Sequence, residues 1–441
     1  MTISRLVAVL GLAAVVASTF LVESAAAESK VRIVRLSDVE GAVQIERAPG
    51  EKLERAFLNL PIVEGSKVKT GKDGRAEIEF EDGSTARIGP NSDLAFARLS
   101  LGDNGEKLNT MQLKWGTFYG NFHEKNGNEF QLKFAQESVT VPQNARYRVV
   151  IGDPHSVTVA VFKGKVEATG PAGKIEIAEK HSAKIDLAAS ETTQKDAVVV
   201  AKSYDENPLD GWDRQQNDYH ERYASAGGSD FSSPYGYGLS DLNYYGSFNM
   251  IPGYGYAWQP FFANAGWNPF MDGAWAYYSG AGYMWVSGYP WGWMPYYYGN
   301  WANAPGYGWI WQPGSWNGWS GVPRVVNGGA AVVPIAPASG HETVMVGRGL
   351  TANASELPAK LTINPGSAGF GVPRGSVNRL DHFNRAMERN SRPLTVAIER
   401  PVEARGGSLG LESGFPGSSA LIPSMPTTHA AAPAQAAGPH K

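Results

Sequence analysis

The stretch Gly74-Arg75-Ala76-Glu77-Ile78-Glu79-Phe80-Glu81-Asp82-Gly83-Ser84-Thr85-Ala86-Arg87-Ile88-Gly89-Pro90 decides the fold class of this sequence. Apolar and acidic side chains alternate over residues 76–80, which is the pattern of a strand with one buried face. The pair Asp82-Gly83 suits a tight turn with positive φ, and the chain runs back through residues 85–88 until Gly89-Pro90 stops it. The stretch therefore predicts a β-hairpin.

The same alternation continues on both sides of this stretch, over residues 31–190. A second hairpin is predicted between Tyr147 and Val161, around the turn Gly152-Asp153-Pro154, and Lys163-Gly164 marks a further turn. Turn signals recur about every 8–12 residues, a spacing that favours an all-β barrel, sandwich or solenoid.

Two segments of this region carry a family resemblance. Residues 74–92 and the later run Val-x-Val-x-Val-Phe-x-Gly-x-Val-Glu at 157–167 resemble the FecR domain of periplasmic sensor proteins, over about residues 31–190. The ferric-citrate sensor of that family relays the state of an outer-membrane transporter to a sigma factor, through a membrane helix and a cytoplasmic segment. Only five residues precede the first apolar run at residues 6–22, so we expect the fold and the periplasmic setting to carry over without the transmembrane relay.

Composition excludes several classes of function. The 441 residues hold 39 Lys and Arg against 42 Asp and Glu, a net charge of −3, which argues against a general nucleic-acid binder. There is no cysteine, so disulfides, thiolate metal centres, a cysteine nucleophile and lipid attachment at cysteine are excluded.

The N-terminus has the pattern of an export signal. Arg5 supplies the positive charge, residues 6–22 are apolar, and Ala25-Ala26-Ala27 provides a small-residue cleavage site. An uncleaved membrane anchor is the alternative, but this apolar run is at the short end of what spans about 30 Å of hydrocarbon. We expect residues 1–27 to be a signal peptide cleaved near Ala27, and the mature protein to be periplasmic or secreted, with no stable membrane span.

Residues 191–230 change in character and predict a helical linker. Trp212, Tyr219 and Tyr223 are spaced seven and four apart, which places the three rings on one face of a helix. We interpret this face as one that packs on a neighbouring domain.

Residues 231–323 are dominated by aromatic side chains, with 11 Trp, 14 Tyr and 5 Phe, and they contain no Lys or Arg. The aromatic positions are periodic: the pairs that end in Trp258, Trp285 and Trp311 are offset by 27 and 26 residues. A fixed period marks a repeated unit, and aromatics at i and i+2 between Gly and Pro predict one β-hairpin per repeat. Glycine would place the turns and leave room for the large rings.

Part of this window, about residues 239–320, resembles a bacterial envelope module with no assigned function, which often follows FecR-like domains. The resemblance is carried by the runs Gly292-Trp293-x-Pro295-Tyr296-x-Tyr298-Gly299-x-Trp301 and Gly308-Trp309-x-Trp311-x-Pro313-Gly314. Members often have His at the position of Tyr297 and Arg at that of Asn300, so a polar role at these positions does not carry over. The resemblance implies an architecture and no chemistry.

Two interpretations of the aromatic residues remain open. Periodic rings usually hold a repeat together, which makes them core. Alternatively, exposed rings could stack on the sugars of peptidoglycan or exopolysaccharide, or form a patch that docks a protein. Rings outside the repeat register are the candidates for exposure and ligand binding, namely Trp291, Trp316, Tyr289 and Tyr297.

No motif points to an enzyme, a cofactor or a metal. The eight histidines show no metal-ligand spacing, and neither a G-x-S-x-G elbow nor a phosphate-binding loop is present. The only acidic residues inside the aromatic window are Asp241 and Asp272, which we interpret as solvated turn residues rather than a catalytic pair.

The remaining residues, 324–441, are rich in Gly, Pro, Ala and Ser and predict a mostly disordered tail with a short helix near residues 378–388. The whole chain is therefore expected to be mainly β, with a FecR-like antiparallel domain, a helical linker, an aromatic hairpin-repeat module and a flexible tail. We expect a non-catalytic binding or scaffold protein of the cell envelope, with a protein or a glycan as its partner. A regulatory sensor that contacts an outer-membrane transporter is the further alternative. The oligomeric state is not predicted.

Overall fold

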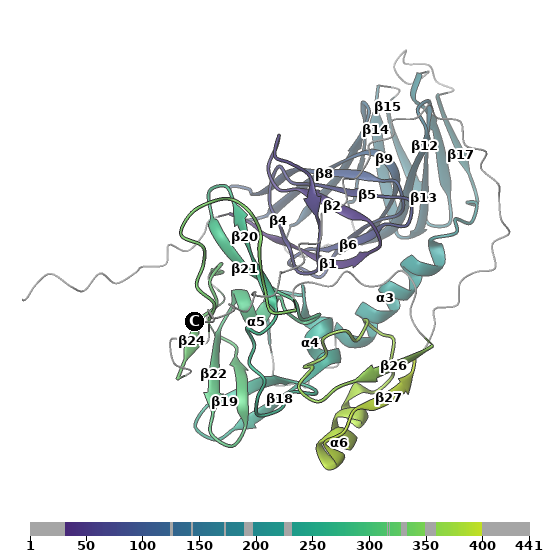
Figure 1. The fold of residues 1–441 in the computed structure, drawn as a ribbon. Coiled ribbons are helices and arrows are strands. Elements are labelled where there is room, and N and C mark those ends of the chain that lie inside the picture. The colour runs from purple at the N-terminus through teal and green to yellow at the C-terminus, as the bar shows by residue number, and fades with distance from the viewer. Residues whose placement is uncertain are drawn as a thin grey trace, which may run out of the picture. The chain divides into compact units, whose positions relative to one another are not determined.

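The structure is a computed structural model, and the residues that it describes belong to one compact unit, Met1–Glu403 (Figure 1). The described ranges are 31–123, 127–142, 144–171, 173–188, 197–224, 232–314, 316, 318–327, 333–348 and 359–398. The predicted signal peptide lies outside them, as do residues 399–441 of the predicted tail.

The described chain is mainly β, as expected, and its first part is a continuous set of antiparallel strands that also includes one parallel pair. The strands are β1 (Val34–Glu40), β2 (Val43–Glu46), β3 (Glu54–Arg55), β4 (Pro61–Ile62), β5 (Lys67–Thr70), β6 (Arg75–Glu79), β7 (Thr85–Ile88), β8 (Asp93–Leu101), β9 (Lys107–Phe122), β10 (Glu129–Phe134), β11 (Glu137–Thr140), β12 (Ala145–Asp153), β13 (Ser156–Lys163), β14 (Lys165–Gly170), β15 (Gly173–Ala178), β16 (Ser182–Asp186) and β17 (Val198–Ala201).

The long strand β9 belongs to two sheets. Its first half pairs with β8 and β10, and its second half pairs with β7 and β12. One sheet therefore runs from β4 through β1, β6, β7, β9, β12, β13 and β16 to β17, and the other from β3 to β15. Phe80, which follows β6, meets Phe130 of β10 edge to face, with ring centroids 5.1 Å apart, so side chains of both sheets share one core.

The predicted hairpin is β6 and β7, paired in register with Ile78 opposite Ala86. One detail of the prediction is wrong, because its polar face is not solvated: Glu77 and Glu79 are buried. The reason lies far away in sequence, since helix α3 (Asp210–Ala224), helix α4 (Leu239–Tyr245) and the loop around Arg374 cover that face.

Helix α3 is the predicted linker helix. Trp212 and Tyr219 are buried on it and Tyr223 is half-buried, as expected for one packed face. The ring of Tyr219 contacts Tyr244 of α4, with centroids 5.5 Å apart. The linker therefore packs on both of its neighbours in the chain.

The aromatic module contains three β-hairpins at the predicted spacing (Figure 1). Their loops fall at Gly253, Gly280 and Gly306, all with positive φ, 27 and 26 residues apart. The first and third hairpins share a sheet in which Trp258 lies opposite Trp311, and the second hairpin stands in a separate sheet. The elements are β18 (Gly246–Ile251) with β19 (Gly255–Pro260), β20 (Gly273–Tyr278) with β21 (Gly282–Ser287), the short helix α5 (Met294–Tyr297), and β22 (Asn300–Ala304) with β23 (Gly308–Gln312).

Each hairpin contains a glycine that makes room for a tryptophan, as the sequence predicts. In the second hairpin a Cβ at Gly273 would lie 2.5 Å from the ring of Trp285, a distance that no side chain tolerates. Gly246 holds the same place against Trp258, and both glycines precede their tryptophan by twelve residues. The glycine-to-tryptophan spacing is thus part of the packing of the repeat.

Much of the predicted tail is folded, which corrects the expectation of disorder for residues 333–348 and 359–398. Strand β25 adds to the second hairpin by pairing with β20, and β26 pairs with β27. The predicted helix is present as α6. The elements are β24 (Val325–Val326), β25 (Val344–Val346), β26 (Lys360–Ile363), α6 (Leu380–Asn390) and β27 (Leu394–Ala397). Among the described residues, no helix has both the length and the apolar character needed to cross a membrane.

Candidate functional site

The three tryptophans in the repeat register form the core of the aromatic module. Trp258, Trp285 and Trp311 have no exposed surface. Trp258 donates its indole N–H to the carbonyl of Leu242, and Trp311 donates to that of Tyr298. Because no face of these rings is open, they cannot stack on a ligand.

The expectation that rings outside the register are exposed is wrong for three of the four candidates. Tyr289, Trp291 and Tyr297 are buried. Trp291 donates its N–H to the carbonyl of Ala368, a residue of the segment predicted to be disordered. That segment covers the ring, and its packing could not be read from the local sequence.

The fourth candidate, Trp316, is half-buried. Its ring contacts Tyr298 with centroids 5.3 Å apart, and its carbonyl accepts a hydrogen bond from Tyr235. The four candidates therefore do not form one open ring platform. Because Tyr289, Trp291 and Tyr297 are buried, their rings are not accessible for stacking on a sugar.

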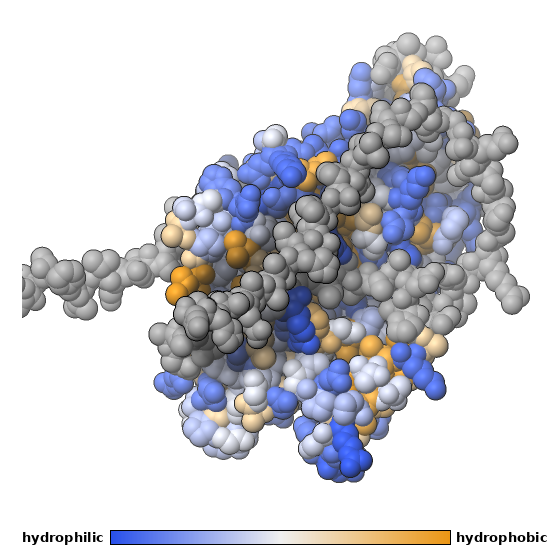
Figure 2. Space-filling view, in the orientation of Figure 1, coloured by the Kyte–Doolittle hydropathy of each residue, from blue (hydrophilic) through white to orange (hydrophobic). Residues whose placement is uncertain are grey.

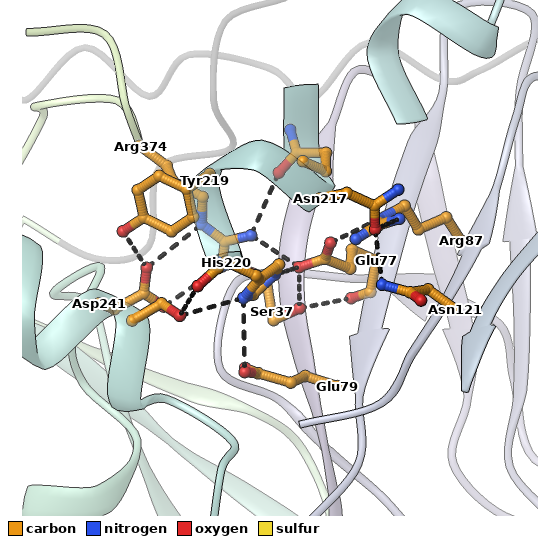
Figure 3. A network of polar contacts seen from close by, with 12 residues as sticks. Ser37, Glu77, Glu79, Arg87, Asn121, Asn217, Tyr219, His220, Asp241 and Arg374 are labelled. Atoms are coloured by element: carbon orange, nitrogen blue, oxygen red, sulfur yellow. Dashed lines mark hydrogen bonds and ion pairs between the residues drawn. The ribbon is translucent and has the colours of Figure 1, made fainter. Parts of the chain in front are cut away.

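A different constellation stands out in the structure, namely a buried network of charges where the β strands, α3, α4 and the loop around Arg374 meet (Figure 3). We call it the charged junction. It consists of Arg35, Glu77, Glu79, Arg87, Asp213, His220, Asp241 and Arg374. Apart from His220, which is slightly exposed, these side chains are at least nine-tenths buried.

Arg374 is the most connected member of the charged junction. Its guanidinium lies 2.6 Å from Glu77 Oε1 and 3.2 Å from both carboxylate oxygens of Asp241, and it donates to the carbonyl of Ser37 at 2.7 Å. It also lies over the ring of Tyr219, 5.0 Å from its centroid. One side chain therefore joins the C-terminal segment to β1, β6, α3 and α4.

Glu77 connects the strands to helix α3. Its second oxygen lies 2.7 Å from Arg87 Nε, and Arg87 also pairs with Asp213 of α3 at 2.7 Å. His220, about two turns further along the helix, places Nε2 2.9 Å from Glu77 Oε1 and Nδ1 3.3 Å from the hydroxyl of Ser240. The helix is thus attached to the hairpin by two polar contacts seven residues apart, Asp213 with Arg87 on β7 and His220 with Glu77 on β6.

Arg35 connects the strands to the aromatic module. It lies 2.5 Å from Asp241 and 3.2 Å from Glu79, and donates to the carbonyl of Pro290 at 2.7 Å. The neighbouring Asn59 donates to the carbonyl of Tyr289. The β domain and the aromatic module are therefore joined by directed polar contacts as well as by apolar packing.

Burial raises and the shared cations lower the pKa values of these acids, and the balance differs from one acid to the next. Burial by itself would raise the pKa of Glu77, but attraction to His220, Arg87 and Arg374 holds it well below its ordinary value. The pKa of Asp241 is lowered as well: burial opposes the shift, and Arg374 and Arg35 outweigh it. Burial raises the pKa of Glu79, against the attraction of His220 and Arg35. Glu77 and Asp241 are thus the two carboxylates that the cations hold in their charged form.

Asp241 and Asp272 are not the solvated turn residues that the sequence suggested. Both are buried, and Asp272 accepts a charge-assisted hydrogen bond from Arg348 Nη2 at 2.7 Å and lies 3.3 Å from the hydroxyl of Tyr289. Their arginine partners stand 76 to 206 residues away in the sequence. No local pattern could have paired them, and only the absence of other charges in the window hinted that these two acids were special.

The charged junction has the contacts of a structural joint. Each acid is held by at least one cation, and the carboxylates are almost completely buried among their partners (Figure 3). Among the residues that the structure describes, no group of three or more His, Asp or Glu side chains is arranged to hold a metal ion.

The accessible feature of the β domain is the edge formed by β17. This strand pairs with β16 through Val198 to Ala201, and no other described strand pairs with it. Val199 and Val200 are 63% and 43% exposed. An unpaired apolar edge is a template for another strand, because its backbone N–H and C=O groups point outward.

The matching edge of the other sheet is different. Strand β15 carries Lys174 and Glu176, which pair with Glu167 and Lys165 of β14. Charges of this kind keep an edge from pairing with other chains. Strand β17 has no charged residue between Val198 and Ala201, so the two edges of one domain have opposite character.

Comparison with known proteins supports the division seen in the structure. Residues 66–167 match the family described as FecR protein, and residues 239–339 match a family of unknown function, DUF6600. No curated protein matches the sequence.

Two crystal structures of a presumed anti-sigma factor from Parabacteroides distasonis are similar at 14% and 13% identity, each with a TM-score of 0.27. The match covers 33% of this chain and 63% of each of those chains, so this chain spans less than two thirds of their length. A likeness this distant bears on neither fold nor function here. The family matches do: the chain carries a FecR domain in residues 66–167 and, separately, a region of the DUF6600 family in residues 239–339.

Proposed function

We propose that this protein is a non-catalytic regulatory protein of the cell envelope that acts by binding another protein through its FecR domain. The single observation that carries the proposal is the edge of β17, which pairs with β16 alone among the described strands and where Val199 and Val200 are exposed. A partner that adds an extended strand there would satisfy the backbone groups of this edge and cover the valines. The FecR match supports a regulatory role of this kind, and the resemblance names an outer-membrane transporter as a class of partner.

The proposal includes export by residues 1–27. Sequencing the N-terminus of the protein recovered from its host tests this part. A chain that begins near Glu28, found in the envelope or medium, supports export, and a full-length chain retained in the cytoplasm contradicts it.

Site-directed photo-crosslinking in the living host tests the binding edge. A photo-reactive amino acid at position 199 should give a discrete adduct with one protein, because that side chain lies on the apolar edge. The matched position is Lys174, which is exposed on the charged edge strand β15. A second variant, Val200→Lys, places a charge beside the probe and should abolish the adduct.

Two results would contradict the proposed interface. One is the absence of any adduct at position 199 while the protein is folded and abundant. The other is the same set of adducts from positions 199 and 174, which would show random encounters rather than a specific edge.

A further inference from the structure

The segment 359–398 has a charge balance opposite to that of the whole chain. It holds six Lys and Arg residues against two acidic residues, whereas the complete chain has a net charge of −3. One of these cations, Arg374, is buried in the charged junction. The others are exposed, and all except Lys360 lie on or beside α6. Such an asymmetry is a signal of interaction with an anionic partner.

The exposed cations of α6 form a line that we call the basic stripe. Its members are Arg379, Arg385, Arg389 and Arg392. Arg385 and Arg389 are four residues apart and share one face of the helix, whereas Arg379 and Arg392 lie just before and just after the helix. The exposed ring of His382 lies beside them, with its Nε2 2.6 Å from Arg379 Nη2. The helix is 11 residues long, so the stripe extends over about 16 Å at 1.5 Å per residue.

The opposite face of α6 fixes the stripe in place. Leu380 and Met387 are buried, and the side-chain oxygen of Asn384 accepts a hydrogen bond from the backbone N–H of Phe262. The helix is thus held against the aromatic module on one side, and no described part of the chain covers the side that carries Arg385 and Arg389. The surface over α6 is strongly hydrophilic in Figure 2.

Two acidic residues lie beside the stripe and neutralise part of it. Asp381 pairs with Arg385 at 2.7 Å and with Arg379 at 3.5 Å, and Glu388 accepts a hydrogen bond from Asn384. No ion pair links Arg389 or Arg392 to an acid in the described part of the chain. An exposed pair such as Arg385 with Asp381 contributes little and exchanges readily for an external anion.

We propose that the basic stripe binds a linear acidic polysaccharide. A guanidinium matches a carboxylate or sulfate with two parallel hydrogen bonds, and a row of them gains affinity by releasing counterions from a polyanion without needing a pocket. A membrane surface fits less well, because Leu380 and Met387 are turned inward and nothing apolar accompanies the cations. A single-stranded nucleic acid fits less well too, because Phe370 and Phe383 pack against the core and offer no ring for stacking.

An acidic peptide is the remaining class of anionic ligand that the basic stripe could bind. A peptide gains specificity from a strand edge or an apolar groove beside the charges, and the exposed face of α6 provides neither. The choice of a polysaccharide over other linear polyanions rests on the export proposed above, whereas polyanion binding itself does not.

Titration of the full chain with polygalacturonate at about 20 mM and about 150 mM salt tests the proposal, since screening weakens such contacts. Neutral dextran, poly-L-glutamate and vesicles of phosphatidylglycerol are the comparison probes. We expect saturable binding to polygalacturonate that weakens with salt, no binding to dextran, and weaker binding to the other two anions.

The variant Arg385→Gln/Arg389→Gln should bind polygalacturonate about tenfold more weakly, with a smaller salt dependence. The matched control is Arg98→Gln/Lys180→Gln, which removes the same charge from exposed sites on the β domain and should bind like the unmodified chain. Equal losses in both variants would show a general charge effect and overturn the site. Absence of binding, or binding to poly-L-glutamate or vesicles as tight as to polygalacturonate, would overturn the polysaccharide. None of these results depends on β17, so they leave the proposed protein interface untouched.

Discussion

Replacing Arg374 by Met should be among the most destabilising single changes in this chain. The substitution keeps an unbranched side chain but removes the cation that joins Glu77, Asp241 and the Ser37 carbonyl. Breaking a buried ion pair by removing one partner costs about 3–5 kcal/mol, because the other charge stays buried.

The remaining contacts place the loss near the lower end of that range. Glu77 keeps Arg87 at 2.7 Å and His220 at 2.9 Å, and Asp241 keeps Arg35 at 2.5 Å. Neither acid is left without a cation, so we expect Arg374→Met to lower the free energy of unfolding by about 3 kcal/mol. Arg374→Lys keeps the positive charge but not the planar guanidinium, and it should lower the free energy of unfolding by less, about 1–2 kcal/mol.

Urea unfolding followed by tryptophan fluorescence measures these differences. The control is Arg379→Met, an exposed arginine five residues away, which should change the free energy of unfolding by less than about 0.5 kcal/mol. Combining Arg374→Met with Asp241→Asn should cost at least about 1.5 kcal/mol less than the sum of the two single changes, because both single changes remove the same ion pair between Arg374 and Asp241. If Arg374→Met unfolds like Arg379→Met, or if the double change is additive, the charged junction does not hold the chain together as argued here.

Two further predictions concern acid and the hairpin loops. The folded-state pKa of Glu77 is lowered from 4.5, so its contribution to the free energy of unfolding is present above that pH and is lost as the pH falls through the folded-state pKa. The Glu77→Gln variant should therefore be less stable than the unmodified chain at neutral pH, but it should lose less stability between about pH 5 and about pH 3. If the urea midpoints of the two proteins fall by the same amount over this range, the prediction is contradicted. Gly306 has φ +80 with open space around it, so Gly306→Ala should cost about 1 kcal/mol from backbone conformation alone, whereas Gly266→Ala, where φ is not positive, should be nearly neutral in the same unfolding assay.

The features that could be predicted from the sequence are those set by neighbouring residues. The turn Asp82-Gly83 and the alternation before it were sufficient for the hairpin of β6 and β7. The aromatic period was sufficient for three hairpins, because the glycine that admits each tryptophan lies only twelve residues before it.

The features that could not be predicted depend on what covers a surface. Glu77 follows the pattern of a solvated position, yet Arg374 reaches it from almost 300 residues away. Composition predicted disorder for the segment that carries Arg348 and Arg374, because glycine, proline and serine favour it. The buried ion pair of Arg374 with Asp241, the pair of the exposed Arg348 with the buried Asp272, and the strand β25 hold that segment against the core. A few charged contacts outweigh average composition, and nothing local marks which arginine makes them.

The near repetition of Gly255-Tyr256-Ala257-Trp258-Gln259-Pro260 as Gly308-Trp309-Ile310-Trp311-Gln312-Pro313 has a geometric cause. Trp258 lies opposite Trp311, and around this pair the Gln259 amide donates to the carbonyl of Tyr307 while the Gln312 amide donates to that of Tyr254. Each glutamine follows its tryptophan by one residue and bonds the residue four before the other tryptophan, so the two motifs are related by a local twofold. The second hairpin has Val286-Ser287 in place of Gln-Pro and cannot form this pair. Its Trp285 instead donates its backbone N–H to the carbonyl of Gly321. The repeat is therefore retained where it pairs with itself and altered where it does not, which explains its sequence by packing rather than by ligand binding.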